Sequence, residues 1–252
     1  MTKIVLVVEY DGTRYHGFQY QENAITVQAE LEGAIKSLTN ESIRVIAASR
    51  TDAGVHAKGQ VVSFRTHIQL PSRTWIRALN HYLPSDVAIK EAWPVDESFD
   101  VRRDAIRREY QYSIFNNKVR SPLKLRFAYF FPQPLDIEAM QEGSQTLEGE
   151  HDFASFTPVA LGKAGKSIRT VYKSGVKRQG DTVYFSIVAN SFLPHQIRHT
   201  VGALLQVGRG KIGVAEFKKI KQARQPGLAG PSVPPHGLCL MSVQYLKSLG
   251  NE

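Results

Sequence analysis

The order of the hydrophobic periods along the first part of the chain restricts the possible folds more than any other feature. Six segments there have the apolar spacing of a strand or a helix. They come in the order strand, helix, strand, strand, helix, strand, at residues 3–10, 27–38, 43–48, 59–65, 75–79 and 87–93. Thr26 stands where it can cap the first helix. This is the order of elements in a ferredoxin-like unit.

The rest of the chain also mixes strand patterns with helix patterns. Strands are predicted at 108–115, around Val171, at 183–188 and at 237–245, and helices at 137–147, 195–206 and 214–220. A polar crossover at 100–104 marks the expected domain boundary. We therefore predict an α+β protein of two α/β domains, residues 1–103 and 104–252. Residues 159–166, rich in Gly, Ala and Lys, are expected to form a mobile loop.

The polar run from Ser49 to Ala57 lies between two predicted strands and should be a loop. Asp52 has Arg50 two residues before it and Gly54 two residues after it. A guanidinium beside a carboxylate favours the ionised form, which a nucleophile or base requires. The alternative, which loop statistics alone favour, is a turn residue whose carboxylate accepts a backbone N–H.

The balance of charged residues indicates what kind of molecule the protein could bind. The chain has 32 Lys and Arg against 23 Asp and Glu, a net charge of +9. This balance is typical of proteins that bind polyanions such as nucleic acid, although a merely soluble basic protein would show it equally well. Cys239 is the only cysteine, so no intrachain disulfide can form, and we expect it to be a packed strand residue. No signal segment or bilayer-spanning run is present, so a cytoplasmic protein is expected.

Two further groups of residues could carry chemistry. Alternation in the strand at 108–115 places Tyr110 and Tyr112 on one face, where both could simply be core residues. Arg198 lies on the predicted helix 195–206, where an ordinary surface arginine is the alternative. His195 and His199 are four residues apart, as metal ligands on a helix can be. No Glu follows His195, which disfavours zinc.

The run from Ser49 to Ala57 resembles the signature Gly-Arg-Thr-Asp-Ala-Gly-Val-His-Ala of the TruA family of tRNA pseudouridine synthases, with Ser49 as the one departure. Other stretches resemble the family's pattern in the same order. They are 10–21, with Phe18 where Trp is usual; 27–32; Arg-x-Tyr-x-Tyr at 108–112; 192–202, with Gln196 where Met is common; and 234–238. The resemblance covers nearly the whole chain.

The resemblance implies two ferredoxin-like-related α/β domains, with antiparallel sheets joined across a basic central cleft that holds Asp52. It implies that the protein isomerises uridine to pseudouridine in tRNA, in the anticodon stem-loop at positions 38–40. Asp52 would be the nucleophile, Arg50 and Arg198 would be its catalytic partners, with Arg198 paired to Asp52, and Tyr110 would stack on the flipped uracil. It also implies a homodimer with one tRNA bridging two protomers.

The reaction itself limits what else is needed. The bond from N1 of uracil to C1′ breaks, C5 bonds to C1′, and only the C5 proton leaves. Because no redox change occurs, we expect no cofactor and no metal. Arg14, Tyr15 and His16 are expected to offer a cation and stacking rings to single-stranded RNA. The competing hypotheses are a noncatalytic RNA-binding protein of ferredoxin-like fold and a nucleoside hydrolase.

Overall fold

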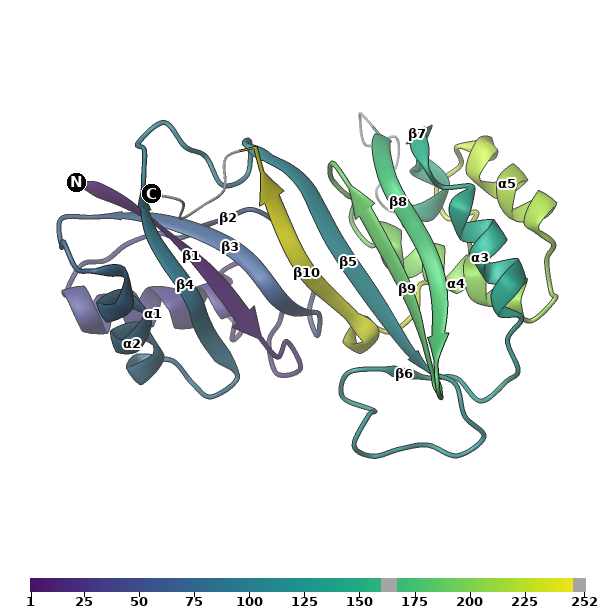
Figure 1. Cartoon of the computed structure of the whole chain (residues 1–252), viewed down its shortest axis with the longest axis horizontal. Helices are drawn as coiled ribbons and strands as arrows, with labels where there is room; N and C mark the ends of the chain where they lie inside the picture. Colours follow the sequence, from purple (N-terminus) through teal and green to yellow (C-terminus); the bar gives the residue numbers. More distant parts are fainter. Residues whose placement is uncertain (160–166, 247–252) are drawn as a thin grey trace. The chain divides into compact units, whose positions relative to one another are not determined.

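The computed structural model describes residues 1–159 and 167–246 (Figure 1). The chain divides into two compact units. The first contains Met1–Arg108 and the segment from Cys239 onward, and the second is Glu109–Leu238. The predicted mobile loop at 159–166 lies outside the described residues except for Val159. Among the helices of the described residues, none is both long enough and apolar enough to cross a membrane.

The first unit begins with the element order that the sequence predicts. The elements are β1 (Thr2–Tyr10), α1 (Val27–Thr39), β2 (Ile46–Ala47), β3 (His56–Thr66), α2 (Ser72–Tyr82) and β4 (Val87–Val95). The strands β4, β1 and β3 are neighbours in that order and antiparallel, and β2 pairs antiparallel with β3. The last strand, β10 (Leu238–Tyr245), runs parallel to the start of β3.

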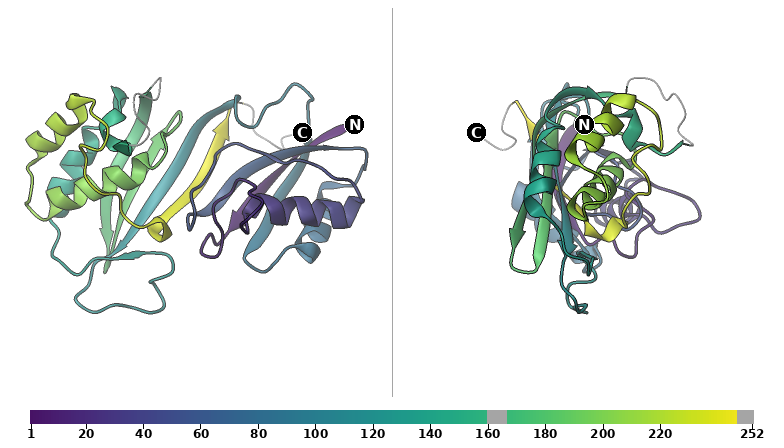
Figure 2. Two further views of the ribbon diagram at one scale, coloured as in Figure 1. Left: turned by 180° about the vertical axis from the view of Figure 1, so that it is seen from behind. Right: turned by 90° about the vertical axis from the view of Figure 1, so that its right-hand side faces the viewer.

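Alternation along the strands gives this sheet two buried faces. Both helices lie side by side on one face (Figures 1 and 2). There the Trp75 ring of α2 meets the edge of Phe64 in β3, with the ring centres 5.5 Å apart. On the other face, Val5 and Val61 form a core with Val101, and Tyr245 of β10 packs against it. The sequence predicts the Thr26 cap correctly, since the Thr26 hydroxyl accepts the N–H of Ala29.

The second unit contains most of β5 (Ala105–Phe115), which starts in the first unit. Its strands follow the order β5, β9 (Thr182–Ala189), β8 (Ile168–Gln179) and β7 (Gly149–Asp152), and the short β6 (Tyr129–Phe130) pairs parallel with the end of β5. The helices α3 (Ile137–Gln145), α4 (Gln196–Gly208) and α5 (Val214–Ala223) contact one another (Figure 2). The second unit also contains two 3₁₀ turns, η1 (Ala154–Phe156) and η3 (Pro235–Gly237). The chain is thus a mixed α+β protein with mostly antiparallel strands.

The compact units differ from the predicted division after Arg103 in one main respect. The segment from Cys239 onward groups with the first unit, because β10 pairs with β3. The division into domains 1–103 and 104–252 stays a prediction. Two short strands, β6 and β7, lie outside the strands that the sequence pattern predicts. Segments of two to four residues are too short for their periodicity to be read.

Candidate functional site

Asp52 lies in a loop between β2 and β3, as the sequence predicts. The loop turns at Ala53 and Gly54, where the Val55 N–H donates to the Asp52 carbonyl oxygen over 3.1 Å. Gly54 has φ +75°, a left-handed conformation that residues with a Cβ rarely adopt. Thr51 and Val55 are buried, Asp52 is half-buried and Arg50 is exposed. Asp52 therefore lies in the chain between two buried residues.

A second loop, residues 11–19 between β1 and α1, holds the Asp52 loop through its backbone. The Phe18 N–H donates to the Thr51 carbonyl oxygen at 3.1 Å, and the Gly54 N–H donates to that of Tyr15 at 3.2 Å. Glycines make this approach possible. A Cβ at Gly12 would lie 2.0 Å from the Val55 carbonyl oxygen, and Gly17, at φ +91°, would place one 2.8 Å from that of Thr51.

Buried side chains hold the start of the Asp52 loop, and sequence reasoning did not identify them. Gln60 of β3 donates to the Ser49 carbonyl oxygen at 2.7 Å and accepts the Ser49 N–H at 3.3 Å. The hydroxyls of Tyr10 and Thr51 lie 2.7 Å apart. The signal that could have identified Gln60 is an amide directly before the apolar pair Val61 and Val62 of a predicted strand, because an amide that is buried with such a strand needs partners.

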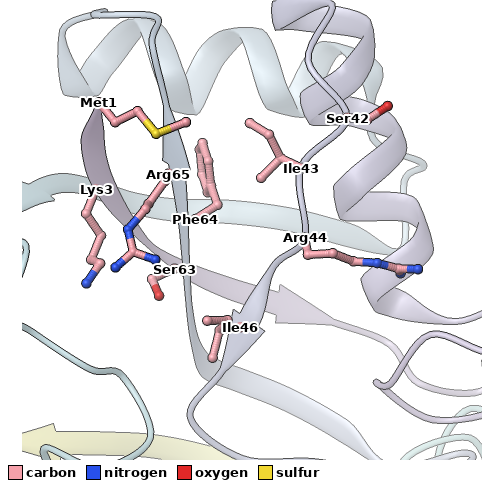
Figure 3. A pocket seen from close by; sticks show the side chains of 9 residues that line it. All are labelled: Met1, Lys3, Ser42, Ile43, Arg44, Ile46, Ser63, Phe64 and Arg65. Carbon is pink, nitrogen blue, oxygen red and sulfur yellow. The ribbon is translucent and has the colours of Figure 1, made fainter.

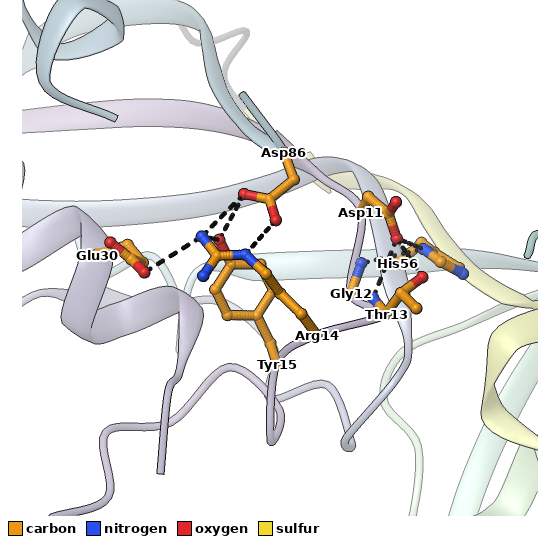
Figure 4. A network of polar contacts seen from close by, with 8 residues as sticks. All are labelled: Asp11, Gly12, Thr13, Arg14, Tyr15, Glu30, His56 and Asp86. Carbon is orange, nitrogen blue, oxygen red and sulfur yellow. Dashed lines mark hydrogen bonds and ion pairs between the residues drawn. The ribbon is translucent and has the colours of Figure 1, made fainter. Parts of the chain in front are cut away.

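His56 closes the loop at the first residue of β3, where it is buried. Its Nδ1 accepts the Gly12 N–H at 3.0 Å and lies 3.2 Å from a carboxylate oxygen of Asp11 (Figure 4). The bond from Gly12 requires Nδ1 to be without a proton, whereas an ion pair with Asp11 requires the ring to be charged. In either state His56 ties the end of the Asp52 loop to the start of the 11–19 loop.

The expectation that Arg14 and Tyr15 offer a cation and a stacking ring to RNA is wrong for Tyr15. Tyr15 is only 2% exposed, and its hydroxyl donates to Asp86 at 2.7 Å (Figure 4). Arg14 forms an ion pair with the same carboxylate and another with Glu30. The sequence pattern could not reveal this because Asp86 is far away along the chain. His16 remains exposed.

These contacts determine the ionisation of the Arg14, Tyr15 and Asp86 network. Burial is the main reason that the pKa of Tyr15 is raised well above its ordinary value, so its hydroxyl remains a donor. Burial alone would raise the pKa of Asp86, but the hydrogen bonds from Arg14 and Tyr15, with the positive charge of Arg14 and a backbone hydrogen bond, lower that pKa overall. The network therefore fixes the Tyr15 side chain while the Tyr15 carbonyl oxygen holds Gly54.

Tyr110 and Tyr112 lie in β5 and are both buried. The Tyr112 hydroxyl donates to the Pro234 carbonyl oxygen at 2.7 Å, which is a structural role within the second unit. The Tyr110 ring meets Phe192 edge to face, with the ring centres 5.2 Å apart. The pattern therefore correctly predicts one shared face. A base-stacking role for Tyr110 stays a prediction.

Arg198 lies in the first turn of α4, half-buried. Its Nε donates to the Val233 carbonyl oxygen at 2.8 Å, and the Val233 N–H donates back to the Arg198 carbonyl oxygen at 3.2 Å. A Cβ at Gly202 would lie 2.4 Å from the Pro231 carbonyl oxygen, so this loop lies directly on the helix. Arg198 is therefore a side chain held in place, unlike the surface arginine of the alternative interpretation.

The two histidines near Arg198 stack on one another, with ring centres 6.5 Å apart. His199 Nδ1 lies 2.8 Å from the Gly230 carbonyl oxygen, and burial is the main cause that lowers the pKa of His199. Within residues 1–159 and 167–246, no group of three His, Cys, Asp or Glu side chains is placed to hold a metal ion. The zinc alternative therefore has no third ligand in that part of the chain.

None of the predicted site residues lines a pocket of the first unit that Figure 3 shows. Its lining includes three cations, Lys3, Arg44 and Arg65. Each already has a protein partner: Lys3 donates to two backbone carbonyl oxygens, Arg44 pairs with Glu32, and Arg65 pairs with Glu97. This pocket is therefore not the candidate site.

Comparison with known proteins agrees with the resemblance seen in the sequence. A family model described as tRNA pseudouridine synthase matches residues 6–104 and 144–246. The chain belongs to the tRNA pseudouridine synthase family. Its relatives named tRNA pseudouridine synthase A include one from an Exiguobacterium species, 39% identical over 98% of this chain and 99% of the relative. Those from Thermoanaerobacter sp. strain X514 and Acetivibrio thermocellus are 41% and 42% identical over 97% of this chain and the whole of each relative.

The residues matched to the synthase family include the Asp52 loop, the 11–19 loop that holds it, and α4 with Arg198. Residues 105–143 lie outside the matched ranges, and they contain Tyr110. Asp52 and Arg50 belong to the first compact unit, whereas Tyr110 and Arg198 belong to the second. The structure thus fixes the local surroundings of each predicted residue within its own unit.

Proposed function

We propose that this protein isomerises uridine to pseudouridine in tRNA, with Asp52 as the nucleophile. Membership of the synthase family supports the reaction. The observation that carries the residue assignment is the Asp52 loop itself, because backbone and side-chain hydrogen bonds hold the residues on both sides of half-buried Asp52. A reactive group held this firmly needs no further ordering when the substrate arrives.

The chemistry needs little beyond one ionised carboxylate. The N1–C1′ bond breaks, the uracil turns, and C5 bonds to C1′. The C5 proton leaves and N1 gains a proton, so atoms and charge balance without an oxidant. Asp52 attacks the nucleoside or removes a proton, depending on the scheme. Arg50, two residues before Asp52, is proposed as its catalytic partner.

The remaining assignments follow the resemblance. Arg198 is proposed to pair with Asp52, and Tyr110 to stack on the uracil once it is flipped out of the RNA, since an aromatic ring holds a base by its face. The target is proposed to be the anticodon stem-loop, at positions 38–40. The order β4, β1, β3, β2 in the first unit supports a ferredoxin-like origin for that unit. We further propose a basic central cleft, a homodimer and a cytoplasmic location.

Tritium release tests the proposal directly. Forming the C5–C1′ bond must expel the C5 hydrogen, so unmodified tRNA carrying [5-³H]uridine should release tritium with the wild-type protein, without added metal or cofactor. Asp52→Asn should lower the rate by on the order of 10³-fold or more while tRNA binding persists. Asp96→Asn, an exposed carboxylate in the first unit, is the matched control and should match the wild type.

The other outcomes each count against a specific part of the proposal. Release by Asp52→Asn at a rate comparable with wild type would mean that another residue is the nucleophile. If the wild-type protein bound tRNA and released no tritium, the RNA-binding alternative would be preferred. Appearance of free uracil would identify the hydrolase alternative.

A further inference from the structure

The segment between β5 and β6 carries a dense positive charge that the proposed chemistry does not use. We call residues 118–127 the basic loop. It has four exposed cations, Lys118, Arg120, Lys124 and Arg126, and the sequence contains no acidic residue from 110 to 135. In Figure 1 this segment is part of the long teal loop that leaves the end of β5 and returns through β6.

Apolar side chains lie exposed between these cations. Leu123 is 92% exposed, Val119 is 72% exposed and Phe127 is 50% exposed. Scattered single apolar residues on a surface need no explanation, but three within nine positions on one loop form a combined basic and apolar surface. Such a surface matches a partner that is negatively charged and also presents apolar faces.

The basic loop has a defined structure at its base and inside. The Asn116 side chain donates to the carbonyl oxygens of Phe131 and Gln133, each at 2.7 Å, and so closes the base of the segment. Within the loop, the Lys124 N–H donates to the Ser121 carbonyl oxygen at 3.0 Å, and the Phe127 N–H donates to that of Lys124 at 3.0 Å. A partner therefore meets cations on a folded loop, which lowers the entropic cost of binding.

Charge decides which class of partner fits. A second copy of this chain also has a net charge of +9 and the same basic loop, so charge opposes a contact between copies at this surface. RNA offers closely spaced phosphates together with the apolar faces of riboses and unstacked bases. We propose that the basic loop is a docking surface for the phosphate backbone of the RNA substrate, a proposal that rests on the proposed function.

The salt dependence of binding tests this role. In one variant all four cations become Gln, and in its matched partner each Lys becomes Arg and each Arg becomes Lys. The dissociation constant for unmodified tRNA is measured from 50 to 300 mM KCl by fluorescence anisotropy. The Gln variant should reduce the slope of log K against log salt by about 0.7–0.9 per lost phosphate contact and weaken binding at least about tenfold at 0.1 M salt. The charge-conserving variant should keep the wild-type slope.

A second control removes positive charges from another part of the same unit. Lys218→Gln with Lys219→Gln removes two exposed cations from α5 and should change the slope less than the single variants Lys118→Gln and Lys124→Gln combined. Those single variants also replace the fourfold variant if its thermal melting shows that it is not folded. An unchanged slope in the basic-loop variants, or an equal loss in the α5 variant, overturns the proposal.

Activity and assembly separate this proposal from its alternatives. At saturating tRNA the Gln variant should release tritium at the wild-type maximal rate, with only KM raised. A wild-type protein that releases none contradicts the proposed function, while the salt slopes still decide the role of the basic loop. If the Gln variant sediments at a smaller mass than wild type and its slope is unchanged, the loop contacts another copy, which overturns the proposal.

Discussion

At the scale of single residues, Gln60 is one of the buried side chains that hold the loop of the candidate nucleophile. It is fully buried and bonds both the N–H and the carbonyl oxygen of Ser49, one residue before Arg50. Gln60→Leu keeps a similar volume and removes both bonds, together with a longer one that Gln60 donates to the Tyr10 hydroxyl at 3.5 Å. Because a buried backbone group that loses its partner costs about 1–3 kcal/mol, we expect the free energy of unfolding to fall by about 2–4 kcal/mol.

The same variant should also affect turnover. A loosened Ser49 displaces Arg50 and Asp52, so kcat for tritium release should fall more than KM rises. Urea unfolding and single-substrate kinetics measure the two effects. Gln179→Leu, an exposed glutamine at the end of β8, is the control and should change neither. Wild-type stability and kcat in Gln60→Leu would contradict the role assigned to this side chain.

Individual residues also show which features of the site could be predicted from the sequence. The sequence predicted the loop position of Asp52 and the Thr26 helix cap correctly, because both depend on neighbours a few positions away. Tyr15 was misassigned because its partner, Asp86, is distant in sequence. The anchoring of Arg198 by Val233 was missed for the same reason. Local chemistry could be predicted, whereas contacts created by folding could not.

At the scale of elements, hydrogen bonds join the Asp52 loop to the 11–19 loop. The contacts of Asp86 with Arg14 and Tyr15 stabilise the 11–19 loop. Asp86→Asn should weaken this support. A hydrogen bond to a charged group contributes about 1.5–3 kcal/mol, so we expect a loss of that size in the free energy of unfolding at pH 7. Asp96→Asn, an exposed carboxylate of the same unit, should cost less than about 0.5 kcal/mol.

The pH dependence distinguishes a charged support from mere packing. The folded state lowers the pKa of Asp86, so its contribution is fully present above the unfolded pKa, near 4, and is lost as the pH falls through the lower folded value. The stability difference between wild type and Asp86→Asn should therefore be constant from pH 7 to pH 5 and shrink below about pH 4. A difference that widened on acidification would contradict this account.

At the scale of the whole molecule, the chain leaves the first unit within β5 and returns to it at β10. The periodicities predicted the closing strand itself, but nothing in them shows which strand it joins. β10 pairs parallel with the start of β3, where Cys239 lies opposite His56 and Leu240 opposite Ala57. This pairing joins residues more than 180 positions apart, and strand partners at that distance leave no local signal. The last strand therefore supports the residue that closes the Asp52 loop.

Two substitutions of Tyr245, at the end of β10, should weaken the attachment of this strand to the first unit to different extents. Its hydroxyl donates to the Val101 carbonyl oxygen at 2.7 Å, and its ring centre lies 5.1 Å from that of Phe99. Tyr245→Phe removes only the hydrogen bond and should cost about 0.5–1.5 kcal/mol of the free energy of unfolding. Tyr245→Ala also removes the packing of a half-buried ring and should cost about 2–3 kcal/mol.

Urea unfolding measures both steps, and Tyr82→Ala on the exposed side of α2 is the control, with an expected change below about 0.5 kcal/mol. Because β10 lies beside His56, Tyr245→Ala should also lower kcat for tritium release at temperatures where the protein is still folded. If Tyr245→Ala were no more destabilising than Tyr82→Ala, the end of the last strand would not hold the first unit. A destabilised variant with wild-type kcat would instead show that the Asp52 loop keeps its geometry through the 11–19 loop and Gln60 alone.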